Sequence, residues 1–123
     1  MGRSIVADKS FAFAVRIVNL YKFLCGEKKE YILSKQLLRS GTSIGANTSE
    51  ALQAQGKRDF LSKINIALKE AYESRYWIEL LYATEYLEDM QKESILADCN
   101  EIISLLVAIA KTTKKNLITE KEK

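Results

Sequence analysis

The sequence predicts an all-α protein, an antiparallel up-down-up-down four-helix bundle, and three observations carry this prediction. The 123 residues include no proline and only five glycines, while Ala, Leu, Ile, Glu and Lys are abundant. Four stretches repeat apolar residues every three or four positions, which is the spacing of an amphipathic helix. The connections between the stretches are short, which favours antiparallel neighbours in one domain over residues 1–123.

The first helix is expected over residues 8–25, where Asp8 or Ser10 can cap its start. Its apolar residues form two adjoining rows that cover about half of the helix, more than the ~100° stripe of an ordinary surface helix. A polar turn follows. The second helix is expected over residues 30–55, and Gly56 is expected to stop it.

The third helix is expected over residues 57–88, since this stretch contains neither glycine nor proline. Two acidic residues then supply a turn. The fourth helix is expected over residues 91–117, with Lys111, Lys114 and Lys115 near its end, where positive charge suits the helix dipole. The charged tail beyond this helix is expected to fray.

The run RSGTSIGANTSEA, residues 39–51, is unusual for the middle of a helix because it contains Gly41 and Gly45. Each glycine costs roughly 1 kcal/mol relative to alanine in a helix. Either a loop interrupts the helix here, or the backbone approaches a neighbour closely. Both glycines fall on the apolar face of the second helix, which favours close packing against another helix or against a large aromatic side chain of the third helix.

A second row in the same helix is wholly polar, and the third helix offers polar partners for it. The row consists of Gln36, Ser40, Ser43, Asn47 and Glu50, and the partners are Lys63, Glu70, Glu73 and Arg75. Buried amides, hydroxyls and carboxylates require hydrogen-bond partners. We interpret these residues as a polar seam between the two helices, with Asn47 and Glu70 as one candidate pair. The alternative is an ordinary solvated face.

Two segments of the chain resemble a known family. SKQLLRSGTSIGANTSEA (residues 34–51) and KRDFLSKINIALKEAYESRYWIELL (residues 57–81) are similar to the four-helix-bundle proteins encoded in intervening sequences of bacterial 23S ribosomal RNA genes. The matching positions are Ser43, Ile44, Asn47, Glu50, Ala51, Asp59, Phe60, Ile66, Ala67 and Glu70. Thr48 departs from the family, which usually has an apolar residue there.

The resemblance implies an antiparallel four-helix bundle that assembles into a homopentameric ring. It does not imply an enzyme. Related proteins, the accessory variability determinants, serve as accessory subunits in diversity-generating retroelements. The resemblance therefore implies RNA, or a reverse-transcriptase-like protein, as a partner.

The residue content argues against catalysis. No histidine is present, which removes Ser–His and Cys–His nucleophiles, His-ligated zinc and the Glu-x-x-His di-iron site of helical bundles. Glu70 and Glu73 lie one turn apart, and a structural role is favoured there over an acid pair or a metal site. We expect no enzymatic activity, no cofactor, no metal and no small-molecule substrate.

The cysteine content and hydropathy indicate a cytoplasmic protein. Cys25 and Cys99 are far apart in the sequence and are expected to be reduced thiols. No stretch approaches the ~18 apolar residues of a membrane span. We therefore expect no membrane association.

The net charge of +3 is too small to identify a nucleic-acid-binding protein by itself. The most basic region is the first helix with its following turn, and its candidate nucleic-acid contacts are Lys9, Arg16, Lys22, Lys28 and Lys29. On a monomer, a solvated face is the favoured interpretation of these cations. In a ring they would repeat into a multivalent phosphate-binding surface. Tyr21 and Tyr31 lie nearby, although core or interface packing is the favoured role for them.

Apolar residues remain beyond the expected inner faces of the first and fourth helices. They are Phe11, Val15, Val18, Leu105 and Ile109. Surplus apolar surface of this kind marks an interface, so we expect a homo-oligomer. Two functions remain open, an oligomeric RNA-binding accessory protein and a protein-interaction scaffold without affinity for nucleic acid.

Overall fold

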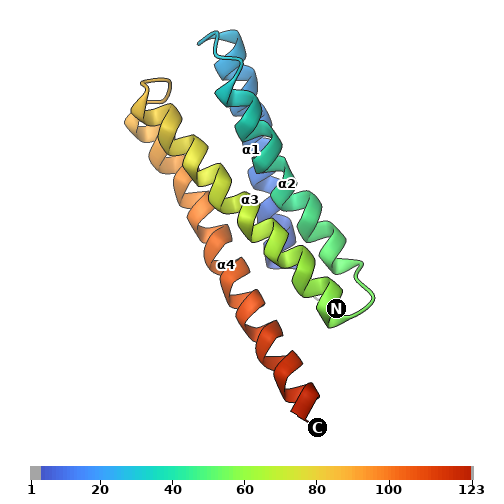
Figure 1. Cartoon of the computed structure of the whole chain (residues 1–123). Coiled ribbons are helices and arrows are strands. Elements are labelled where there is room, and N and C mark those ends of the chain that lie inside the picture. The colour runs from blue at the N-terminus through green and yellow to red at the C-terminus, as the bar shows by residue number, and fades with distance from the viewer. Residues whose placement is uncertain (1–3, 123) are drawn as a thin grey trace.

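The structure, a computed structural model, describes residues 4–122 and is helical over most of that range. Helices α1 (Ile5–Gly26), α2 (Leu33–Leu52), α3 (Lys57–Ala83) and α4 (Asp89–Glu122) alternate in direction along the chain (Figure 1). Among the helix pairs that touch, packing is most extensive between α2 and α3 and least extensive between α1 and α4. The predicted all-α four-helix bundle is confirmed for the described residues.

One apolar row from each helix forms the core. These rows follow the three- and four-residue spacing seen in the sequence, so each helix presents one face to the others. Burial of each such side chain contributes about 1.5–3 kcal/mol. The largest members, each almost completely buried, are Phe13, Ile17, Leu24, Leu37, Ile44, Ile64, Ile78, Leu81, Ile102 and Leu106.

The first two helices do not begin at the predicted residues, because side chains upstream cap them. Helix α1 begins at Ile5 instead of residue 8, since Ser4 Oγ accepts the N–H of Ala7 at 3.2 Å. Helix α2 begins at Leu33 instead of residue 30. The buried carboxylate of Glu30 accepts hydrogen bonds from the N–H groups at the start of α2, so Glu30 caps the helix from outside.

The Glu30 carboxylate accepts three backbone bonds, from Ile32 at 3.2 Å, Leu33 at 2.7 Å and Ser34 at 2.8 Å. Burial opposes ionisation of this carboxyl group, but the bonds from Ser34, Leu33 and Ile32 outweigh burial and lower the pKa of Glu30 below its ordinary value. The charged form is therefore the one that holds the start of α2.

The remaining boundaries also differ from the prediction. Gly56 does not stop α2, which ends at Leu52; it is the N-cap residue of α3, with an extended backbone at φ −158°. Helix α3 ends at Ala83 instead of residue 88, because the chain turns through Glu85 at φ 71°. Helix α4 continues to Glu122, beyond the predicted end at residue 117.

The glycines of α2 pack against α1. The segment is continuous helix, so the loop alternative for residues 39–51 is excluded. A Cβ atom added at Gly41 would lie 2.8 Å from Ile17 Cγ1, and one added at Gly45 would lie 3.4 Å from the carbonyl oxygen of Ser10. Close helix packing is therefore present at Gly41, and its partner is α1 and not an aromatic side chain of α3.

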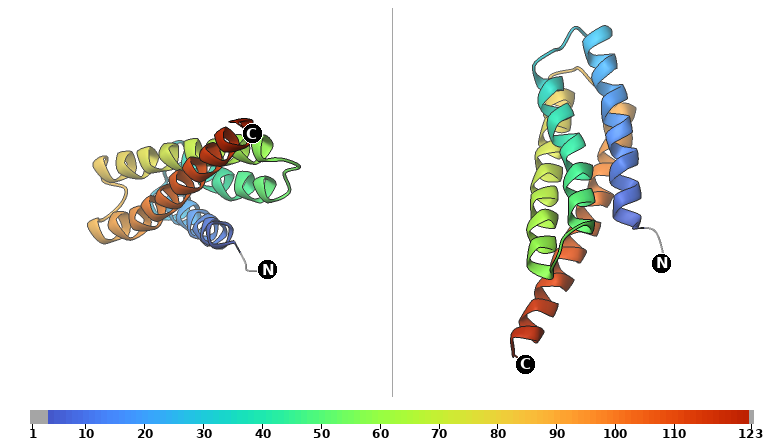
Figure 2. Two further views of the ribbon diagram at one scale, coloured as in Figure 1. Left: turned by 90° about the horizontal axis from the view of Figure 1, so that it is seen from below. Right: turned by 90° about the vertical axis from the view of Figure 1, so that its right-hand side faces the viewer.

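Helix α4 crosses the rest of the bundle obliquely (Figure 2). Its N-terminal half lies beside α1 and α3, whereas its C-terminal end comes to the start of α3 and projects past the bundle (Figures 1 and 2). An ion pair between Lys57 and Glu120 joins the two helices there. This crossing decides which charged side chains of α3 and α4 become neighbours.

Candidate nucleic-acid interface

Helix α4 engages two of the five cations that the sequence indicated on and after the first helix. Lys9 Nζ lies 3.2 Å from a carboxylate oxygen of Glu101. Arg16 donates to Asp98 at 2.6 Å and also contacts Ser94. Each cation must give up a carboxylate before it can bind a phosphate, although exposed pairs of this kind contribute only about 0–1 kcal/mol.

The other three cations of this set do not form one surface with them. Lys28 Nζ lies 5.9 Å from the centre of the Phe23 ring. Lys22 and Lys29 are exposed and have no ion-pair partner within residues 4–122. Lys29 lies in the connector between α1 and α2, where its backbone has φ 55°, and is therefore not part of the α1 surface.

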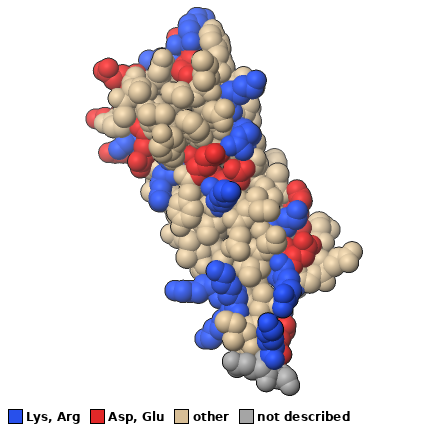
Figure 3. Space-filling view, viewed as in Figure 1, with Lys and Arg blue, Asp and Glu red and all other residues tan. Residues whose placement is uncertain are grey.

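A second group of cations lies along α3 and the C-terminal half of α4, and three of them, Arg58, Lys114 and Lys121, line a groove between the two helices. We call this group the basic face; it consists of Arg58, Lys69, Lys111, Lys114, Lys115 and Lys121. All are exposed, and none has an ion-pair partner among the side chains that the structure describes. In Figure 3 the Lys and Arg side chains accordingly gather near the C-terminal part of α4, whereas Asp and Glu are prominent at the opposite end of the molecule.

The local sequence explains why this face stays uncompensated. Helix α4 has no acidic residue between Glu101 and Glu120, and α3 has none between Asp59 and Glu70. Within the described residues, Glu120 pairs with Lys57, which is not part of the basic face. The positive potential over this surface is therefore not cancelled locally.

A groove runs through the basic face. It has a volume of about 590 Å³ and lies between α3 and α4. Three cations, three apolar side chains and two uncharged polar residues line it. The lining residues are Arg58, Leu61, Ser62, Asn65, Lys114, Leu117, Ile118 and Lys121. Cations and apolar side chains that line the same groove suit a ligand that has both phosphates and planar rings.

Sequence reasoning missed the basic face because it summed charge by segment. Helix α4 begins with acidic residues and ends with lysines, so its total is close to neutral. The segment 57–89 is acidic in total because Glu85, Glu88 and Asp89 follow α3. Within α3, Glu70 and Glu73 face α2, whereas Arg58 lines the groove beside α4. Reading charge along the three- and four-residue rows of each helix would have separated the two signs.

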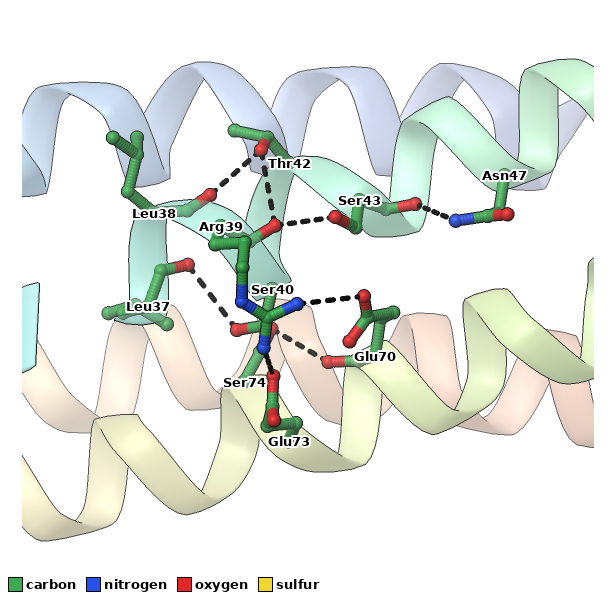
Figure 4. A network of polar contacts seen from close by, with 10 residues as sticks. All are labelled: Leu37, Leu38, Arg39, Ser40, Thr42, Ser43, Asn47, Glu70, Glu73 and Ser74. Carbon is green, nitrogen blue, oxygen red and sulfur yellow. Dashed lines mark hydrogen bonds and ion pairs between the residues drawn. The ribbon is translucent and has the colours of Figure 1, made fainter. Parts of the chain in front are cut away.

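The predicted polar seam between α2 and α3 is only partly an interhelical contact (Figure 4). Ser74 Oγ donates to Ser40 Oγ at 2.9 Å, and both side chains are fully buried. Arg39 bonds Glu70 at 3.3 Å and also pairs with Glu73. Glu70 and Glu73 are thus partners of one guanidinium group, a structural arrangement in which neither carboxylate stands alone.

Other residues of the row satisfy their polar groups within α2. Ser43 donates to the carbonyl of Arg39 at 2.6 Å, and Asn47 donates to the carbonyl of Ser43 at 2.9 Å (Figure 4). Gln36 is exposed. Asn47 and Glu70 do not bond each other, so that candidate pair is wrong.

The remaining residues of the predicted seam form contacts at the protein surface. Glu50 and Lys63 form an ion pair of 3.0 Å between α2 and α3. Arg75 lies on the opposite side of α3, where it donates to Asn100 of α4 at 3.2 Å. The seam is therefore a short buried contact at Ser40 and Ser74 flanked by surface ion pairs.

Apolar surface remains exposed along α1 and the end of α2. Phe11 is 71% exposed and Val15 is 47% exposed. Leu52 is 51% exposed and lines, with Phe11 and Gly45, a groove of about 400 Å³ between the two helices. Of the other predicted surplus residues, Val18, Leu105 and Ile109 are half-buried within this chain. We call the surface of Phe11, Val15 and Leu52 the apolar face.

No helix in the described part of the chain combines the length and the apolar character that a bilayer span requires.

Comparison with known proteins identifies the family. The family model described as the 23S rRNA-intervening sequence protein matches residues 3–108. The chain is also similar to a crystal structure of a protein of unknown function from the S23 ribosomal protein family of Bacteroides thetaiotaomicron. The identity is 63% and the TM-score 0.86, over 87% of this chain and 99% of that chain. No curated protein matches. The family match ends before Lys111, so four of the six cations of the basic face lie outside it. This chain belongs to the 23S rRNA-intervening sequence protein family.

Proposed function

We propose that this protein is a non-enzymatic, self-associating RNA-binding accessory protein of the cytoplasm. The observation that carries the proposal is the basic face, a surface of exposed lysine and arginine side chains without acidic partners in the described part of the chain. Phosphate neutralisation by such side chains, with release of counterions, supplies most of the affinity in nucleic-acid binding that does not depend on sequence.

Self-association is the second part of the proposal, and it is supported by the apolar face. Phe11, Val15 and Leu52 present more apolar surface than a monomer needs to leave in water. A homopentameric ring, the assembly that the family resemblance implies, would place a basic face on every subunit. Linked faces raise the avidity for one RNA without any new kind of contact.

Salt-dependent binding to RNA tests the proposal directly. We expect the logarithm of the affinity for a labelled RNA to fall linearly with the logarithm of the salt concentration. The double variant Lys114→Ala/Lys121→Ala should weaken binding and reduce this slope by about one per cation removed. An RNA affinity that does not change with salt, or no binding at all, would contradict the proposal.

A matched variant compares the two sets of cations. Lys22→Ala/Lys29→Ala also removes two exposed lysines that have no ion-pair partner within residues 4–122, but from the α1 region. If RNA binds at the basic face, this variant should change the RNA affinity and its dependence on salt only slightly. A larger effect than that of Lys114→Ala/Lys121→Ala would move the RNA site to the α1 cations.

The alternative function is a protein-interaction scaffold without affinity for nucleic acid. The exposed apolar face favours it, since that surface suits a protein partner as well as a second copy. The family resemblance adds a reverse-transcriptase-like protein as one such partner. Self-association with no salt-dependent RNA binding would favour this alternative.

A further inference from the structure

Resting on the proposed RNA binding, we infer that the basic face takes a single-stranded segment of RNA, whose bases stack on Tyr72 and Tyr76. The two tyrosines continue the stripe of α3 that begins at Arg58 and passes through Asn65 and Lys69, since these residues follow one another at intervals of three to seven positions. Cations and aromatic rings along one line form the arrangement that tracks a single strand.

Contacts to α4 place Tyr72 on the side of α3 that carries the basic face. The guanidinium group of Arg75 lies 5.1 Å from the centre of the Tyr72 ring and bonds Asn100 of α4 at 3.2 Å. Tyr76 follows one helical turn later. Lys69 precedes Tyr72 by three positions, so a cation and an aromatic ring are adjacent on the helix surface.

Both rings are exposed and are braced from one side. Tyr72 is 43% exposed although Arg75 covers part of it. Tyr76 is 59% exposed and meets the Trp77 ring edge-to-face at 5.1 Å and 74°. Neither hydroxyl group has a hydrogen-bond partner within residues 4–122, so no hydrogen bond holds either ring against the protein. Bracing reduces the entropy that each ring loses when a base stacks on it.

The dimensions suit a short single strand. From Arg58 to Tyr76 the stripe is about 27 Å long at 1.5 Å per residue, which corresponds to roughly eight nucleotides at the 3.4 Å spacing of a stacked strand. The bases of a duplex are paired and stacked on each other inside the helix, so their faces are unavailable to tyrosine. A duplex would therefore use the cations of the basic face alone.

Three labelled RNA probes of 12 nucleotides separate stacking from phosphate contacts. They are an unstructured single strand, the blunt duplex of that strand with its complement, and an abasic single strand that keeps the phosphates. The probes are titrated with the full-length protein and followed by fluorescence anisotropy. We expect the single strand to bind more tightly than both the duplex and the abasic strand, by about 5- to 100-fold for the stacking of one base.

Tyrosine variants give the residue-level test. Tyr72→Leu/Tyr76→Leu should lose about 5- to 100-fold in affinity for the single strand for each ring removed, and it should leave duplex affinity and the salt slope unchanged. Tyr72→Phe/Tyr76→Phe keeps the rings and should bind as the wild type does. Tyr31→Leu, which removes a tyrosine of similar exposure (57%) in the connector before α2, is the matched control and should have no effect. Circular dichroism melts establish that each variant is folded.

The outcomes distinguish this inference from the proposed function. Equal affinities for the single strand, the duplex and the abasic strand would overturn the inference while leaving RNA binding by the basic face intact. Wild-type binding by folded Tyr72→Leu/Tyr76→Leu would overturn it in the same way. Failure of every probe to bind would overturn the proposed function itself.

Discussion

Replacing Gly41 with alanine tests the close packing of α2 against α1. The new Cβ atom would lie 2.8 Å from Ile17 Cγ1 and 2.9 Å from Ile17 Cγ2, closer than side-chain carbons approach one another. Ile17 cannot swing away, because it is branched at Cβ and 1% exposed in the core. Overpacking of this kind costs about 1–3 kcal/mol, whereas the higher helix propensity of alanine returns about 1 kcal/mol.

Gly45→Ala is the matched control. Its Cβ atom would lie 3.4 Å from the carbonyl oxygen of Ser10, an ordinary contact, and it gains the same propensity. Because the propensity terms cancel, Gly41→Ala should be less stable than Gly45→Ala by about 1–3 kcal/mol. For a chain of this size the difference in melting temperature is roughly 4–12 °C.

The measurement is a thermal melt by circular dichroism at one protein concentration, since self-association makes the midpoint depend on concentration. A double-mutant cycle locates the clash. In the background Ile17→Ala, which lacks Cγ1 and Cγ2 and keeps only Cβ at 3.3 Å, Gly41→Ala should lose most of its destabilising effect. Equal midpoints for Gly41→Ala and Gly45→Ala would refute the close approach.

Three further predictions follow from the buried groups and the apolar face. Glu30→Gln should lower the free energy of unfolding by about 1–2 kcal/mol. Because the pKa of Glu30 is lowered in the folded state, the difference between the two proteins should be complete above the unfolded carboxyl pKa of ~4.3 and should disappear as the pH falls through the folded pKa. Urea titrations from pH 7 to 3 measure it. Burial raises the pKa of the Cys99 thiol to about 12, so folded Cys25→Ser should resist iodoacetamide at pH 8 and react only in denaturant, as followed by mass spectrometry. Phe11→Ser/Val15→Ser should reduce the mass measured by light scattering toward the 14.0 kDa monomer without lowering helicity, and an unchanged mass would remove the apolar face from the assembly interface.

Local rules explain the part of the fold that could be predicted. Apolar spacing identified the four helices and most of the core, because a helix with one apolar row must bury it. Helix ends were less predictable. The Glu30 carboxylate holds the start of α2 from outside the helix, and the backbone at Glu85 turns through φ 71°; neither is a strong signal in the sequence.

The polar seam shows the limit of pattern reasoning in one helix. The sequence placed Ser40 and Asn47 in one row of α2, but only the residues of that row that face α3 can bond to α3. Ser40 contacts Ser74 there, whereas Asn47 bonds its own helix. A short polar side chain can bond a carbonyl of the preceding turn or a group on another helix, and the two outcomes have the same sequence signature.

By itself, the sequence determined that four amphipathic helices form one bundle and that Gly41 faces a close neighbour. Only the tertiary structure decided which neighbour that is and which charges lie together. The oblique crossing of α4 brings its acidic first half against Lys9 and Arg16 of α1 and carries its lysines to the start of α3. Charge is a property of each residue, but the potential that a phosphate meets depends on the distances between residues of different helices, and those distances are set by packing.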